Sequence, residues 1–217
     1  MEARKIDTKI LIISLVAILA VEWCLRVFVA KGLYNAMVIL GAVRLLDMVL
    51  IILIVLTWGK GISSVGLAPS EMIRGLKRGL IWSAGFGIIT VIAAIGLYLA
   101  GFNASILIQA RLPAQPRQVM LFFLVGGMIG PIAEEMFFRG ILYGFFRQWG
   151  VLIAVTLSSV LFVLAHPISH GVFFAQVVGA IVFAVAYEVE GSLLTPITIH
   201  VLGNTAIFTL ALIQKPG

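Results

Sequence analysis

The sequence predicts an all-α protein, a polytopic bundle of membrane helices, and two properties of the chain lead to this prediction. Of the 217 residues, 62% are hydrophobic and only 11% are charged, and the mean hydropathy is +1.17. A soluble domain carries about 25% charged residues. The apolar residues also gather in long runs, and no polar stretch between them is long enough to form a separate core. We therefore expect a single integral membrane domain over residues 1–217.

About seven apolar runs are suited to form transmembrane helices. A bilayer core of about 30 Å requires about 20 apolar residues in a helix, whose backbone polar groups then pair within the segment. The runs show no internal repeat. The predicted spans lie at residues 9–30, 34–58, 79–100, 118–147, 151–166, 171–188 and 193–213.

The first run follows a basic amino terminus, as the apolar region of a signal peptide does. Phe28-Val29-Ala30 has a bulky residue where a cleavage site needs a small one. We therefore expect this run to be retained as the first span.

The connection between the second and third runs predicts an amphipathic helix that lies on the membrane surface. Pro69 and Ser70 are typical of a helix start, and the segment after them combines an apolar face with a basic face. The apolar face consists of Met72, Ile73 and Leu76, and the basic face of Arg74, Lys77 and Arg78.

The net charge of +6 and the pI near 9.8 indicate a lipid partner and no nucleic acid, because the Lys and Arg residues fall mostly between the apolar runs. Their distribution favours a cytoplasmic amino terminus and an outside carboxyl terminus. The residues assigned to the inside are Arg4, Lys5, Lys9, Lys60, Arg74, Lys77, Arg78 and Arg147, against Lys31, Arg111, Arg117 and Lys215 outside.

Two pairs of opposite charges lie inside the first two runs. Glu22 and Arg26 are spaced i,i+4, and Arg44 and Asp47 are spaced i,i+3, so each pair can neutralise itself along one helix face. We interpret both pairs as structural, either within one helix or as a lock between the first two helices.

The fourth run contains the sequence IAEEMFFRGILYG, which places two acids and a base in an apolar context. Glu135 and Arg139 are spaced i,i+4 and can pair, whereas Glu134 is turned by about 100° around the helix and is left over. An intramembrane carboxylate is a functional candidate, here a general acid or base, and the alternative is a hydrogen bond to another helix. Gly126 and Gly130 favour the functional interpretation because they allow close approach by neighbouring helices.

His166 ends the fifth run at a depth that matches Glu134. The turn near Gly150 lies about 15 residues after Glu134 and about 16 before His166, so the two side chains reach a similar depth of an antiparallel hairpin. His166 also follows Phe162 by one helical turn, which places both rings on one face. Taken alone, His166 would be an interfacial histidine at a helix end; beside Glu134 it is a candidate catalytic partner.

The last run carries His200 and Asn204 on one helix face, at i,i+4 spacing. Such a pair in a membrane helix is more often an interhelical hydrogen bond than a catalytic feature. Here it follows an acid pair and a histidine in the same small protein, so both residues remain site candidates.

The order of these motifs resembles the signature of the CPBP family, the CAAX proteases and bacteriocin-processing enzymes that are also called Abi proteins. The resemblance covers residues 118 to about 210, within the motif-bearing helices at 118–213, while residues 1–117 contribute only hydrophobicity. The motifs are Glu134-Glu135-x-x-x-Arg139, Phe162-x-x-x-His166 and His200-x-x-x-Asn204.

The resemblance implies an intramembrane endopeptidase that hydrolyses a peptide bond of a membrane-associated protein or peptide. Peptide hydrolysis needs an activated water and donors aimed at the tetrahedral oxygen. The implied roles are water activation by Glu134 and His166, oxyanion stabilisation by His200 and Asn204, and support by the ion pair of Glu135 and Arg139.

Metal dependence is a point that the resemblance leaves open. Glu134, His166 and His200 would supply a zinc shell of one acid and two histidines, with an open position for water. The chain has no H-E-x-x-H sequence. We favour a metal-free glutamate mechanism without a cofactor, with zinc as the alternative.

Two other functions compete with the peptidase. A bacteriocin-immunity or peptide-binding membrane protein would use the same polar centre to hold a hydrophobic peptide without cutting it. A proton-coupled transporter would also contain buried acids and histidines, but the absence of an internal repeat argues against it. The short loops resemble those of prokaryotic members of the family, so we expect the protein in a prokaryotic cytoplasmic membrane.

Overall fold

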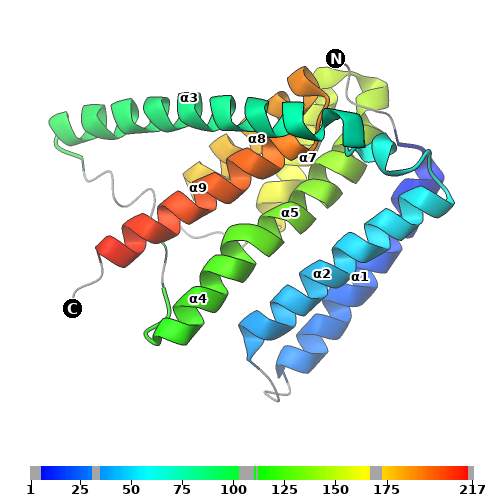
Figure 1. The fold of residues 1–217 in the computed structure, drawn as a ribbon, viewed down its shortest axis with the longest axis horizontal. Coiled ribbons are helices and arrows are strands. Elements are labelled where there is room, and N and C mark those ends of the chain that lie inside the picture. Colours follow the sequence, from blue (N-terminus) through cyan, green and yellow to red (C-terminus); the bar gives the residue numbers. More distant parts are fainter. Residues whose placement is uncertain (1–5, 31–34, 103–109, 111, 167–172, 215–217) are drawn as a thin grey trace.

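The computed structural model describes the whole chain except residues 1–5, 31–34, 103–109, 111, 167–172 and 215–217, and within the described residues it contains helices and turns but no strand (Figure 1). The all-α prediction is confirmed. Among the residues that the structure describes, six helical segments are long and apolar enough to span a membrane, and α7 is a shorter apolar helix. The α-helices are α1 (Thr8–Ala30), α2 (Ala36–Thr57), α3 (Met72–Leu99), α4 (Pro116–Leu124), α5 (Gly130–Glu135), α6 (Gly144–Phe146), α7 (Val151–Leu164), α8 (Phe173–Glu190) and α9 (Leu194–Ile213).

Helices α1 and α2 form a hairpin along one side of the bundle (Figure 1). Arg44 of α2 pairs with Glu22 of α1 and, at 2.9 Å, with Asp47. The predicted Arg44–Asp47 pair and the lock between the two helices are therefore confirmed. The carboxylate of Glu22 differs from the expectation, because it pairs across the hairpin with Arg44 while Arg26 is exposed.

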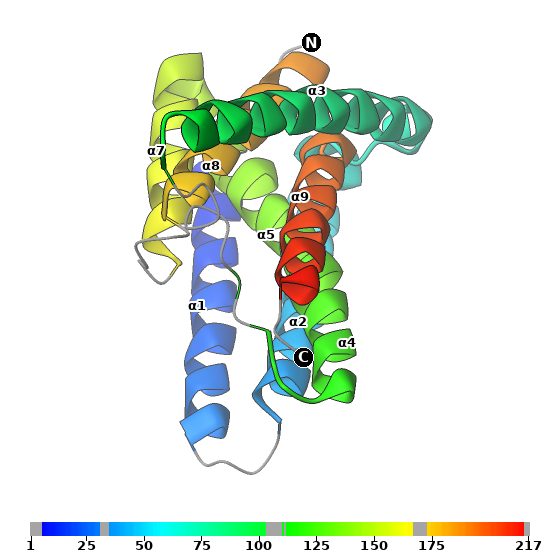
Figure 2. The same ribbon diagram turned by 90° about the vertical axis from the view of Figure 1, so that its left-hand side faces the viewer.

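Helix α3 differs from the predicted arrangement of a surface helix followed by a separate span. No residue between Met72 and Leu99 interrupts the helix, so both segments form one rod of 28 residues. Figures 1 and 2 show this rod lying across one end of the bundle. Gly75 makes the crossing close, because a Cβ added there would lie 2.1 Å from the Oγ of Ser192. The contacts of Gly75 with Ser192 and with Leu194 at the start of α9 hold the rod across the bundle end, and sequence periodicity does not reveal them.

The fourth predicted span is a continuous helical segment, Pro116–Trp149, of 34 residues. Two stretches of it are wound as π-helix, η4 (Val125–Ile129) and η5 (Met136–Tyr143), and the short 3-10 turn η6 (Arg147–Trp149) ends it. The π-helical stretches flank α5, which carries both glutamates. Such widened turns are frequent at functional sites. This segment lies at the centre of the bundle, where it contacts α2, α7, α8 and α9.

The remaining helices close the bundle around the central segment. α7 packs on α8 and on η5, α8 packs on α9, and α9 packs on η4 and α5. Ile6, just before α1, is held against α6, because its N–H donates to the carbonyl of Gly144 at 3.0 Å. Helices α7, α8 and α9 thus surround the segment that carries both acids.

Candidate active site

A fully buried ion pair forms the base of the site. Glu135 and Arg139 are both 0% exposed, and the Arg139 Nη1 donates to Glu135 Oε1 at 3.0 Å, as the i,i+4 spacing predicted. The Nη2 of Arg139 donates to the carbonyl of Ala180 on α8 at 3.0 Å. Its guanidinium also lies 4.6 Å from the ring centroid of Phe162, a distance at which a cation is attracted to the ring face. These contacts join the central segment to α7 and α8.

The left-over acid, Glu134, faces two imidazoles. Its Oε2 lies 3.5 Å from the Nε2 of His166 and 3.8 Å from the Nε2 of His200. The expectation that Glu134 and His166 meet across the hairpin is confirmed. Both separations are longer than a direct hydrogen bond, in which the heavy atoms lie about 2.9 Å apart. At separations this long, a water molecule can bridge the two groups.

The other ring nitrogen of each histidine is held by an acceptor. The Nδ1 of His166 lies 2.7 Å from the carbonyl oxygen of Phe162, and the Nδ1 of His200 lies 2.8 Å from Glu135 Oε1. A carbonyl or an ionised carboxylate only accepts, so Nδ1 carries the proton in both rings. In the neutral rings, each Nε2 therefore offers a lone pair toward Glu134.

Aromatic side chains fix the orientation of both imidazoles. Phe162 lies 4.5 Å from His166 between ring centroids, and Phe183 of α8 stacks on His200 at 4.6 Å. His200 is buried, while 25% of the His166 side chain and 19% of the Glu134 side chain are exposed. The site is thus rigid around His200 and accessible at Glu134 and His166.

Asn204 lies one turn beyond His200 on α9 and is half-buried. Its side-chain amide donates to the carbonyl of Gly126 at 3.0 Å, within the π-helical stretch η4. An amide nitrogen carries two N–H groups, so one remains for another acceptor. The structure therefore ties Asn204 to the central segment and leaves it one donor.

The geometry of the same side chains bears on metal binding. Within the ranges that the structure describes, no group of three or more His, Cys, Asp or Glu residues is arranged to hold a metal ion. Glu134 approaches His166 and His200 in pairs, and Glu135 already occupies the Nδ1 of His200. The contact with Glu135 leaves the Nε2 of His200 free, so the metal-free mechanism stays a prediction.

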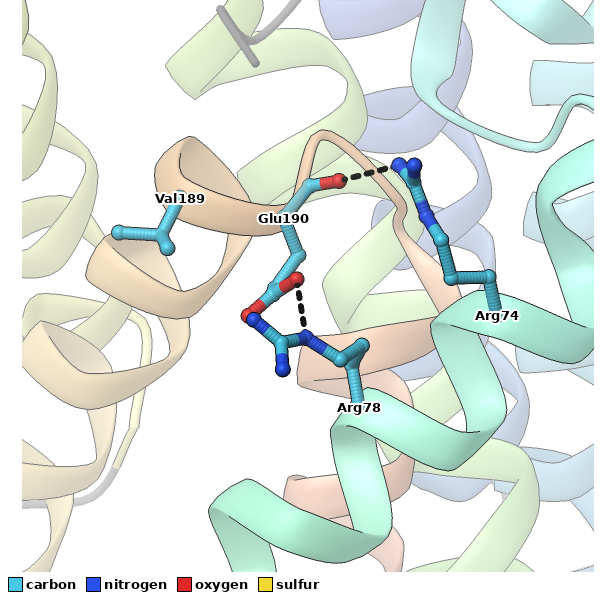
Figure 3. A pocket seen from close by; sticks show the side chains of 4 residues that line it. All are labelled: Arg74, Arg78, Val189 and Glu190. Atoms are coloured by element: carbon cyan, nitrogen blue, oxygen red, sulfur yellow. Dashed lines mark hydrogen bonds and ion pairs between the residues drawn. The ribbon is translucent and has the colours of Figure 1, made fainter.

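An open pocket lies elsewhere, at the end of the bundle that α3 crosses. Figure 3 shows its four lining residues, Arg74, Arg78, Val189 and Glu190, and the bonds from the two guanidinium groups to Glu190. Arg78 Nε donates to Glu190 Oε2 at 2.8 Å. Trp82 donates to the other oxygen of this carboxylate at 2.9 Å. The pocket contains none of the candidate catalytic side chains, and its ion pair joins α3 to α8.

Sequence reasoning missed two partners of the site, Phe183 and the carbonyl of Ala180. Both come from α8, a helix without a predicted functional residue. Ala180 and Ala184 are fully buried at i,i+4 spacing, and such small residues are typical of close contact between membrane helices. This spacing is the signal by which α8 could have been identified as a wall of the site.

Comparison with known proteins agrees with the motifs. Residues 116–206 match the model of the family described as type II CAAX prenyl endopeptidase Rce1-like. A curated relative, the membrane-embedded CAAX protease MroQ of Staphylococcus aureus (strain USA300), is 30% identical over an alignment of 111 positions. The alignment covers 45% of this chain and 42% of MroQ, so the chain spans less than half of that relative. No solved structure matches the chain. The predicted resemblance to CAAX-type proteases is confirmed for this segment.

Proposed function

We propose that this integral membrane protein, whose residues 116–206 carry the type II CAAX endopeptidase likeness, is an intramembrane endopeptidase of the glutamate type. The observation that carries the proposal is the convergence of Glu134 Oε2 on the Nε2 atoms of His166 and His200, at 3.5 and 3.8 Å. The substrate is a peptide bond of a membrane-associated protein or peptide.

The chemistry begins with a water between the carboxylate and the two imidazoles. Glu134 accepts a proton from this water, which then attacks the carbonyl carbon of the scissile peptide bond. Glu134 passes this proton to the lone pair on His166 Nε2, and His166, at the more exposed side of the cluster, delivers it to the leaving amine. A positioned acid or base typically contributes about 10²–10⁴-fold to the rate.

Side chains of α9 stabilise the negatively charged oxygen of the tetrahedral intermediate. Asn204 offers the amide N–H that the carbonyl of Gly126 does not use. His200 donates from Nε2 when it enters the reaction as an imidazolium, and it keeps that proton throughout the cycle. The buried Glu135 carboxylate stabilises this imidazolium through Nδ1, and Arg139 keeps Glu135 in place. Glu135 and Arg139 thus act through His200 and do not touch the substrate.

The proposed topology places the amino terminus on the cytoplasmic side of a prokaryotic cytoplasmic membrane. Ile6 lies beside Gly144 of α6. Arg74 and Arg78 belong to the first turns of α3, the helix that crosses one end of the bundle (Figure 2), and Arg147 follows α6 directly. The positive-inside rule assigns such a basic end to the cytoplasm. A reporter fused to the amino terminus that is active only in the cytoplasm tests this orientation.

The decisive test compares the membrane peptidome of cells that carry the wild type with that of cells that carry Glu134→Gln. We expect peptide termini that occur only with the wild type, because a glutamine amide in place of the carboxylate does not act as a base. Glu71→Gln, a change in the half-buried turn before α3, is the matched control and should leave these termini in place. Identical peptidomes for wild type and Glu134→Gln, with both proteins well expressed, would favour the binding or immunity function.

Metal dependence is tested on the purified protein with a cleaved peptide from that comparison. We expect the rate to stay within about twofold after exhaustive chelation, because the proposed mechanism has no step through a metal. Loss of cleavage on chelation and recovery on adding zinc would replace it with a metal mechanism that uses Glu134, His166 and His200.

A further inference from the structure

A cluster of three charges in the α1–α2 hairpin lies outside the segment that matches the family model. Arg44 Nη1 donates to Asp47 Oδ2 at 2.9 Å and to Glu22. Asp47 is 2% exposed, and among the described residues its Oδ1 has no hydrogen-bond partner. One opposite pair would be enough to lock the two helices. The second acid, buried and incompletely paired, is costly in a membrane and indicates a further role for the cluster.

The helix face that carries Arg44 packs against the central segment. Helix α2 contacts η4, α5 and η5. Gly41, one turn before Arg44, makes this approach close, because a Cβ added there would lie 2.9 Å from the Cγ2 of Val125 in η4. Residues at i and i+3 share a helix face, so Arg44 lies on the side of α2 that meets the segment with the catalytic acid.

Helix α2 contacts α5 directly, so the opposite charges of Arg44 and Glu134 lie on two helices packed against each other and attract across that interface. Among the described residues, the other charged or titratable neighbours of Glu134 include Glu135 beside it in the chain, His166, His200 and Arg139. His166 and His200 come from α7 and α9, and Arg139 from η5. Arg44 is therefore the member of this set that the amino-terminal half supplies.

We propose that Arg44 is a positioning residue for the peptidase reaction, a cation on α2 that holds the Glu134 carboxylate against the two imidazoles. The inference rests on the proposed function and adds a residue that the three motifs do not contain. Glu22 and Asp47 balance the charge of Arg44 within the hairpin. Arg44 itself does not touch the substrate.

The test has to separate this role from a purely structural lock. Removing Arg44 alone leaves two acids without their cation, which can unfold the hairpin. The comparison therefore uses two neutralised backgrounds. The first is Glu22→Gln with Asp47→Asn, which keeps Arg44, and the second adds Arg44→Gln. Both lack the ion pair between α1 and α2, and they differ only in the charge at position 44.

The measured quantities are kcat and KM for a quenched fluorescent peptide built on the cleavage site found with wild type and Glu134→Gln. We expect kcat of the triple variant to be about tenfold or more below that of the double variant, with KM within about twofold. Arg44→Lys in the neutralised background should recover most of the loss, because it restores the charge. Arg26→Gln, which removes an exposed cation from α1, should match the wild type.

Equal kcat values for the double and triple variants would overturn the inference and leave Arg44 as a helix lock. The same holds if Arg44→Lys behaves like Arg44→Gln at equal thermal stability, since a positioning charge would then have no effect. A wild type that cleaves no peptide would overturn the proposed function and, with it, this role. The two failures are thus distinguishable.

Discussion

The two halves of the molecule use membrane charge in opposite ways. In the carboxyl-terminal half, the pair of Glu135 and Arg139 is 0% exposed and every contact leads toward the candidate site. In the amino-terminal half, the Arg44 and Glu22 side chains remain 22% and 27% exposed, and the long helix α3 buries only Gly75 and Gly79. Burial alone does not separate the halves, because Asp47 is 2% exposed and the His166 side chain is 25% exposed. The comparison teaches that the convergence of polar side chains from several helices, more than burial or the presence of charge, marks the candidate site.

Arg139→Met should give the largest loss of stability. It removes the partner of a fully buried carboxylate, and breaking such a pair on one side costs about 3–5 kcal/mol of unfolding free energy. Thermal unfolding in detergent measures the effect. The double variant Glu135→Gln with Arg139→Met should recover part of it, because no unpaired charge is then left. Arg26→Met in the other half should have no effect, and an equal loss there would break the contrast between the halves.

Asn204→Ala should lower kcat by about 10²–10³ without unfolding α9, because it removes one oxyanion donor. The measurement is the cleavage rate of the well-folded variant, with Thr209→Ala, an exposed position one turn further along α9, as the control. Normal cleavage by Asn204→Ala would show that the side chain only ties α9 to Gly126.

Two glycine substitutions on α3 compare a packed position with an open position on the same helix. Gly79→Ala should destabilise the protein by about 1–3 kcal/mol, because its Cβ would lie 2.6 Å from the Cβ of Thr198. Gly85→Ala has nothing within 4 Å and should stabilise the helix by about 0.5–1 kcal/mol. Thermal unfolding of both variants checks the pair. A similar shift for both would contradict the packing of α3 on α9 described above.

The sequence predicted the parts of this structure that depend on local spacing. The ion pair of Glu135 and Arg139 and the pair of Arg44 and Asp47 follow from i,i+4 and i,i+3 positions on a helix, and the meeting of Glu134 with His166 follows from counting residues about a turn. These predictions needed only helix geometry.

The parts that depend on contacts between distant segments were not predicted. The bond of His200 to Glu135 and the stacking of Phe183 on His200 arise from how α8 and α9 pack on the central segment, which no periodicity encodes. The transverse course of α3 is of the same kind, because apolar composition does not distinguish a helix that crosses the bundle end from one that runs along it. The roles of Asn204 and of a metal stay predictions.

The π-helical stretch η5 changes the direction in which the side chains after it point from the central segment. A π turn contains about one residue more than an α turn, so side chains beyond it are rotated by roughly 100° from where an uninterrupted α-helix would point them. Tyr143 at the end of η5 and Arg147 beyond it reach Glu188 of α8, with the hydroxyl of Tyr143 donating at 2.8 Å and Arg147 binding both carboxylate oxygens. Deleting a single residue between Met136 and Tyr143 would rotate the side chains of Tyr143 and Arg147 away from Glu188, although the side chains themselves would be unchanged. The extra residue in the π turn thus sets the rotation between the two parts of the helix, so that one helix can contact two neighbours that lie in different directions.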